Sequence, residues 1–157
     1  MKRAVVMVLG ALLVLSMSTF VQAEAAKAAP AKAAAGKATM WAAEELKWVD
    51  VPGFPVKTTV LSGDATKPGE HIALHKFGAG FAAPMHHHTA DHEVVVVSGT
   101  VIMGPEGEPE KKLGPGSFFS FHGKKKHTTK CAEGADCILA VTSHGAWDVL
   151  VDEPAKK

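Results

Sequence analysis

Short runs of β-prone residues, separated by turn residues at intervals of about ten positions, dominate the chain after residue 55. Glycine and proline cluster between the runs, as at Lys67-Pro68-Gly69 and Gly114-Pro115-Gly116, where the chain can reverse. This pattern predicts strands over Val56–Ser62, His71–Phe77, Ala83–His88, His92–Ser98, Thr100–Met103, Ser117–Phe121, His127–Cys131, Cys137–Ser143 and Trp147–Val151. One short helix is predicted over Met40–Lys47. The sequence therefore predicts an all-β fold, a sandwich or a small barrel, whose interior can hold one small ligand.

The start of the chain has the pattern of an export signal. Lys2 and Arg3 precede an apolar run, and Val21-Gln22-Ala23 supplies the small residues that a signal peptidase needs. We therefore predict a signal peptide over residues 1–23, cleaved after Ala23, and a periplasmic or secreted protein with no membrane attachment after cleavage. A retained anchor helix is the alternative interpretation of the same apolar run.

Residues 24–40 consist almost entirely of alanine and lysine, so they have almost nothing to bury and are predicted to form a disordered linker. The remaining residues, 41–157, are enough for one domain and too few for two ordinary ones.

The charge balance argues against nucleic acid as a partner. Removing Lys2 and Arg3 from the 17 basic residues leaves 15 against 16 acidic ones, a formal charge of −1 with neutral histidines. Arg3 is the only arginine and tyrosine is absent, so the mature chain has no guanidinium to clamp a carboxylate and no phenol to transfer a proton.

Cys131 and Cys137 are the only two cysteines. Because an exported chain meets an oxidising compartment, we predict a disulfide between them, closing a β-hairpin. A zinc site is the alternative, although one C-x5-C pair lacks further ligands at the usual spacing.

Histidines cluster before the valine-rich run. In a strand, residues two apart point to the same face, so His86 and His88 can present both imidazoles to one ion while His87 points away. His92 has the same parity after a short turn. His71 and His75 also share one strand face, where they either line a cavity or lie on an exposed edge.

Two segments resemble the motifs of the cupin family. Gly80, His86, His88, His92 and Gly99 match every spacing of the family's first motif, G-x5-H-x-H-x3/4-E-x6-G. The segment from Gly116 to Cys131 matches the spacing of the second motif, in which His127 takes the place of the histidine ligand. The resemblance extends over about Trp48 to Glu153 and implies a single jelly-roll β-barrel with one divalent metal ion.

The sequence departs from the family at a ligand position. His92 stands where the family's first motif has glutamate, and Glu93 follows it. The resemblance implies a site made of His86, His88, His127 and either His92 or Glu93, and we favour His92 because its spacing and strand parity fit. Four imidazoles suit iron, copper, zinc or nickel better than manganese. The alternative is that these histidines only fill the core or face solvent.

The function expected from the resemblance is a metal-dependent enzyme that acts on a small molecule, with dioxygenase-like chemistry ranked first and Glu93 as a candidate catalytic base. A non-catalytic cupin that binds or senses a small molecule or a metal is the alternative, because a fold does not specify a reaction. Trp48 and Trp147 are expected in the core or at a homodimer contact.

Overall fold

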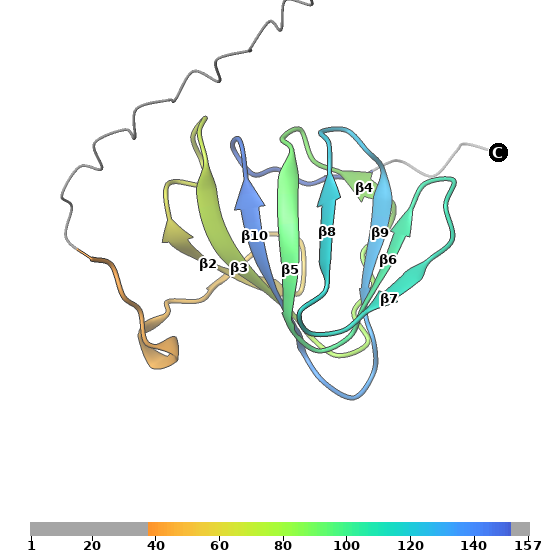
Figure 1. Cartoon of the computed structure of the whole chain (residues 1–157), viewed down its shortest axis with the longest axis horizontal. Coiled ribbons are helices and arrows are strands. Elements are labelled where there is room, and N and C mark those ends of the chain that lie inside the picture. The colour runs from red at the N-terminus through yellow and green to blue at the C-terminus, as the bar shows by residue number, and fades with distance from the viewer. Residues whose placement is uncertain (1–37, 152–157) are drawn as a thin grey trace, which may run out of the picture. The chain divides into compact units, whose positions relative to one another are not determined.

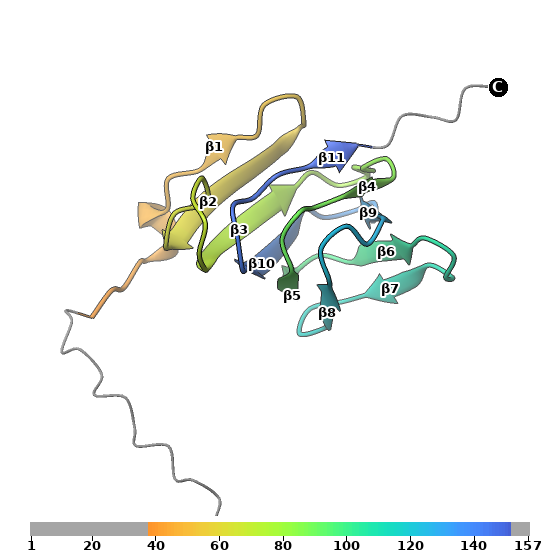
Figure 2. The same ribbon diagram turned by 90° about the horizontal axis from the view of Figure 1, so that it is seen from above.

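Two antiparallel β-sheets make up the fold (Figure 1), seen in a computed structural model that describes residues 38–151. The first sheet has the strand order β1 (Val49–Asp50), β2 (Val56–Ser62), β3 (His71–Phe77), β10 (Cys137–Ser143), β5 (His92–Ser98) and β8 (Phe118–Phe121). The second has the order β11 (Leu150–Val151), β4 (His86–His87), β9 (His127–Cys131), β6 (Val101–Pro105) and β7 (Lys111–Leu113). Figure 2 shows the second sheet from above, with β11 beside β4 and β6 beside β7. The predicted all-β fold class is confirmed.

The predicted signal peptide and all of the predicted linker except residues 38–40 lie outside the described residues. Within residues 38–151, no helix is long and apolar enough to cross a membrane.

The core lies between the two sheets because the strands alternate in side-chain direction. In β5, Val94 and Val96 are buried whereas Val95 and Val97 are exposed. Leu139 and Val141 of β10 join these valines from the same sheet. The second sheet contributes another set of buried side chains, namely Val101, Met103, Leu113 and Cys131. Each sheet therefore presents one apolar face to the other.

Five predicted strands have the predicted bounds, which are those of β2, β3, β5, β9 and β10. Two more differ slightly from the prediction: β6 begins one residue later and ends two residues later, and β8 begins one residue later. The remaining two are much shorter than predicted. Ala83–His88 contains only β4, since Pro84 lacks the N–H group that a ladder needs and Ala82 makes an isolated bridge to Lys130. Trp147–Val151 contains only β11, since the N–H of Trp147 donates to the carbonyl of Ala65 outside any ladder.

The predicted helix over Met40–Lys47 reduces to a single turn of 3-10 helix at Ala43–Glu45. None of its residues is buried, and so isolated a segment gains too little from packing to propagate a helix. Two strands were not predicted. β1 has two residues, and β7 is an edge strand that begins with two exposed lysines, so neither shows clear apolar alternation.

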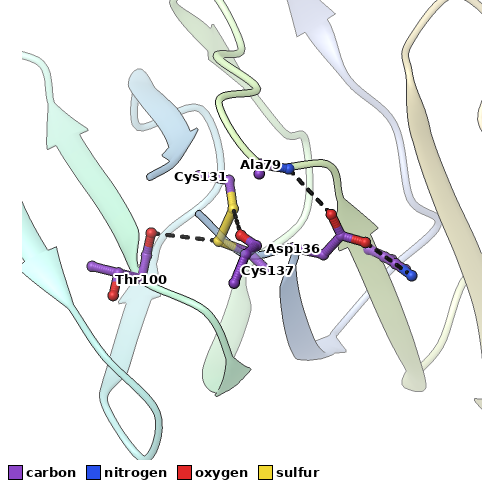
Figure 3. Close-up of a disulfide and its surroundings, with 7 residues drawn as sticks. Ala79, Thr100, Cys131, Asp136 and Cys137 are labelled. Atoms are coloured by element: carbon purple, nitrogen blue, oxygen red, sulfur yellow. Dashed lines mark hydrogen bonds and ion pairs between the residues drawn. A yellow bond between two sulfur atoms is a disulfide. The ribbon is translucent and has the colours of Figure 1, made fainter. Parts of the chain in front are cut away.

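The predicted disulfide between Cys131 and Cys137 is confirmed (Figure 3). Its expected setting, a hairpin, is wrong, because β9 and β10 do not pair and belong to different sheets. The bridge joins the end of β9 to the start of β10 and so connects the two sheets. Beside it, the carboxylate of Asp136 accepts from the N–H of Ala79 at 3.2 Å and pairs with Lys76 at 3.0 Å.

Candidate metal centre

Three buried histidines meet on the inner face of the second sheet. His86 lies in β4, His88 follows it, and His127 begins β9 directly opposite His86 in the register. One ring nitrogen of each lies within 4.8 Å of one ring nitrogen of each of the other two. The three residues are 5%, 5% and 2% exposed. The predicted parity is therefore observed, since His86 and His88 both point inward and converge with His127 across the strand pair.

Backbone carbonyls orient all three rings. The Nδ1–H of His86 donates to the carbonyl of Pro84 at 2.8 Å, and that of His127 donates to Lys125 at 2.9 Å. The Nδ1–H of His88 donates to the carbonyl of Asp148. Because a carbonyl can only accept, each neutral ring carries its proton on Nδ1 and keeps the Nε2 lone pair. The Nε2 lone pairs are the donors that a metal ion would use, and the ring orientations are held by partners outside the cluster.

Burial keeps the imidazoles neutral. Desolvation, with smaller contributions from the neighbouring histidines, lowers the pKa of His88 to about 3 and that of His127 to about 4. Neutral imidazole is the form that binds a metal, and this donor set suits zinc, copper, nickel and iron. These residues could therefore bind a metal ion at near-neutral pH without first losing a proton.

His92 lies beside this cluster without belonging to the 4.8 Å set. It begins β5 in the first sheet and is 3% exposed. Its ring centroid lies 4.8 Å from that of His88 and 6.0 Å from that of His127, and its Nδ1–H donates to the carbonyl of Ala90 at 3.3 Å. Its free nitrogen is again Nε2, as in the three clustered rings.

Glu93 lies on the outer face of the first sheet. Strand alternation turns it away from His92, and its half-exposed carboxylate pairs with Nε2 of His144 at 2.7 Å. The structure brings His86, His88 and His127 together, places His92 next to them, and does not bring Glu93 into the site.

The histidines line a cavity of about 80 Å³. His75 from β3 and Trp147 from the segment before β11 also line it, together with apolar side chains of both sheets. The indole of Trp147 stacks on His88 at 4.1 Å between centroids and lies 5.0 Å from His75. Of the two interpretations of His71 and His75, the exposed edge is wrong, because they are 1% and 6% exposed. His75 lines the cavity and His71 does not.

Trp147 is the site residue whose position in the cavity was hardest to predict from the sequence. It was expected in the core or at a dimer contact, and its position between two histidines depends on a segment without regular structure. The nearby sequence Gly145-Ala146-Trp147-Asp148 contains no ligand spacing that would have indicated it.

Comparison with known proteins shows which family the chain belongs to. The model of a domain of unknown function, DUF4437, matches residues 18–150. The DNA damage-repair/toleration protein DRT102 of Arabidopsis thaliana is 32% identical over 82 residues. That match covers 52% of this chain and 26% of the plant protein, so the chain spans about a quarter of the length of this curated relative.

Three solved structures share the fold. An RmlC-like cupin of Ralstonia eutropha is 26% identical, with a TM-score of 0.57 over 71% of each chain. The polyketide cyclase RemF of Streptomyces resistomycificus is 17% identical, with a TM-score of 0.62 over 76% of this chain and 89% of its own. The DMSP lyase DddQ of Ruegeria pomeroyi is 18% identical, with a TM-score of 0.60 over 73% of this chain and 64% of its own.

The last two identities are low enough that those likenesses concern the fold alone. The family model, in contrast, covers most of the chain and all of its clustered histidines. The chain therefore belongs to the DUF4437 family, a cupin-like family, and has the cupin fold.

Proposed function

We propose that the chain is an exported, metal-dependent enzyme that acts on a small molecule, with dioxygenase-like chemistry ranked first. The observation that carries this proposal is the convergence of three pre-oriented imidazoles on one wall of a cavity lined mainly by apolar side chains. A metal ion held there would supply Lewis acidity and, for iron or copper, the one-electron chemistry that reactions of dioxygen need.

The residues of the chain would have separate roles. His86, His88 and His127 would hold the ion, and His92 is the proposed fourth ligand because its Nε2 is free and its ring adjoins His88. The apolar side chains would exclude water from the bound substrate. Solved structures with this fold include a polyketide cyclase and a lyase, so the fold accommodates enzymes.

Export is part of the proposal. The disulfide between Cys131 and Cys137 supports an oxidising compartment, periplasmic or extracellular, because such bridges are rare in the cytosol. Cell fractionation and the mass of the mature N-terminus test this; a chain found in the cytosol with residues 1–23 retained would contradict it.

The alternative function, a non-catalytic binding or sensing module, is favoured by one observation. Among the described residues that line the cavity there is no carboxylate, lysine or arginine to act as an acid or a base, and the chain has no tyrosine. Only histidines would be available for proton transfer.

The test begins with metal content. The full chain, produced without a polyhistidine tag, is exposed in turn to zinc, copper, nickel and iron, and about one equivalent of at least one metal is expected after desalting. Less than about a tenth of an equivalent of every metal would contradict the proposal.

Oxygen uptake by the iron-loaded and copper-loaded protein with diketones, phenols and thiols then separates the two functions. His88→Ala should abolish both metal retention and turnover, whereas His122→Ala, whose side chain is 98% exposed, should change neither. Tight binding of a compound without turnover would support the binding module.

A further inference from the structure

The cavity contains few polar side chains, and all of them are uncharged. Among the described lining residues, the polar side chains are the five histidines, Thr129 and the indole of Trp147. No guanidinium or ammonium group there can pair with an anion, and no carboxylate there can pair with a cation. An ionised group of a ligand would therefore be stabilised only at the metal, since a buried charge without a partner is very costly.

His75 is the one cavity histidine that stands apart from the proposed metal ligands. It lies in the middle of β3 of the first sheet, paired with Leu139 of β10, whereas the three clustered histidines belong to or adjoin strands of the second sheet. The indole of Trp147 lies next to both His75 and His88, 5.0 Å and 4.1 Å between ring centroids. His75 and the clustered histidines thus form two polar regions of the cavity, and the indole of Trp147 lies beside both of them.

The Nε2 atom of His75 is buried and has no hydrogen-bond partner among the described residues, and the whole residue is only 6% exposed. Buried polar atoms almost always have a partner, and an exception in a ligand cavity points to a group that the ligand brings. A neutral imidazole can either donate to or accept from a hydroxyl, so it suits an uncharged polar group.

From this geometry we infer that His75 is a ligand-binding residue, and that the substrate is a compact molecule which binds the metal through one oxygen and meets Nε2 of His75 through a second, uncharged polar group. The inference rests on the proposed metal site. The small cavity volume, about 80 Å³, restricts the buried part of such a molecule to a few atoms, well below the roughly 300–1,000 Å³ of sites for drug-sized ligands.

Three short carboxylates test the inference by calorimetry on the zinc-loaded full chain. Butanoate and 3-hydroxypropanoate have the same length and differ only in a terminal methyl or hydroxyl group, and succinate ends in a second charge. We expect 3-hydroxypropanoate to bind about three- to tenfold more tightly than butanoate, because of its hydrogen bond to His75, and succinate to bind most weakly.

His75→Phe should reverse the order of 3-hydroxypropanoate and butanoate, since the hydroxyl then enters the cavity without a partner. His75→Gln, which retains a hydrogen-bonding group, should keep the hydroxyl preference. The matched control is His71→Phe, at another buried histidine of β3 that does not line the cavity; it should keep the order of the native chain.

Metal content, measured first, separates the two proposals: a chain that retains none of zinc, copper, nickel and iron contradicts the metal site itself, and a chain that retains another of these metals in place of zinc is titrated in that form. With zinc bound, a native chain that prefers butanoate or binds succinate most tightly overturns the role of His75. The same holds if His75→Phe retains the hydroxyl preference. If His75→Phe does not fold, the native chain and His75→Gln still decide the question.

Discussion

In each of His86, His88 and His127, the same ring nitrogen, Nδ1, is held by a backbone carbonyl. The Nδ1–H donates to this carbonyl, which selects the tautomer and holds the ring, and one ring nitrogen of each histidine lies within 4.8 Å of those of the other two. A metal ion would therefore bind three ligands that need little reorganisation.

Gly99 provides a prediction at the level of one residue. Its φ is +75°, and a Cβ placed there would lie 2.7 Å from the carbonyl oxygen of Asp136 and 2.8 Å from the Cα of Cys137. Gly99→Ala should therefore lower the free energy of unfolding by about 2 kcal/mol or more, from the left-handed backbone and the close contact together.

The matched control for this prediction is Gly107→Ala, at a φ of +79° with nothing within 4 Å of the added Cβ. Gly107→Ala should lower the free energy of unfolding by about 1 kcal/mol, from the left-handed backbone alone. Urea unfolding of both variants measures the difference, and equal losses would contradict the role assigned to the contact.

At the scale of elements, the disulfide connects strands that do not pair with each other. β9 and β10 lie in different sheets, and only six positions separate Cys131 from Cys137. The double variant Cys131→Ala/Cys137→Ala should lose about 2 kcal/mol of unfolding free energy, mainly because the unfolded chain gains freedom. Its metal content should not change, because His127 lies at the other end of β9.

Urea unfolding with and without reductant gives the same comparison in the native chain. An unchanged midpoint on reduction would contradict the stabilising role of the bridge. The double variant, in turn, should not respond to reductant at all.

The segment before β11 orients a proposed metal ligand through Asp148. The carbonyl of Asp148 accepts from His88, and its carboxylate accepts from the backbone N–H of Thr89 at 2.8 Å and from the Thr89 hydroxyl at 2.6 Å. Asp148→Ala should release both Thr89 contacts and weaken zinc binding by up to about 10-fold, because the carbonyl that orients His88 remains but is held less firmly.

Competition with a fluorescent zinc chelator measures this effect. Asp64→Ala is the control, since its carboxylate makes comparable contacts to Thr66 in an exposed turn outside the cavity lining. Equal zinc affinity in the Asp148→Ala variant and the native chain would contradict the prediction.

For the whole molecule, buried neutral histidines predict how stability depends on pH. The pKa values of His75, His88 and His127 are about 4, 3 and 4, lowered by desolvation from 6.5. Below pH 6.5 these histidines bind protons in the unfolded chain but stay neutral in the folded chain. The free energy of unfolding therefore falls as the pH drops towards 4. Each histidine contributes up to about 1.4 kcal/mol per pH unit in this window.

Urea unfolding of the metal-free chain between pH 7.5 and pH 4.5 checks this dependence. The exposed His144 acts in the opposite direction, because a hydrogen bond to Glu93 raises its pKa, and its small contribution is lost as the pH rises. A stability that stays constant from pH 7.5 to pH 5 would contradict the prediction.

Much of the fold could be predicted because strand alternation is a local property. The bounds of β5 and β10 follow from apolar runs limited by Gly99 and by Cys137, and the common direction of His86 and His88 follows from their spacing of two. The short strands β1, β4 and β11 could not be predicted in full, since so few residues show no clear period and their backbone groups depend on partners elsewhere.

The sequence by itself determined the all-β class and the common direction of His86 and His88, because both depend on neighbours within a few residues. It also predicted the cysteine pairing, because an exported chain meets an oxidising compartment. Only the tertiary structure decided that the disulfide joins two sheets, that Glu93 faces outward to His144, and that His75 shares a cavity with the clustered histidines. Those relations depend on which strands lie next to or opposite each other once the sheets close around the core, and the period of a single strand carries no information about its distant neighbours.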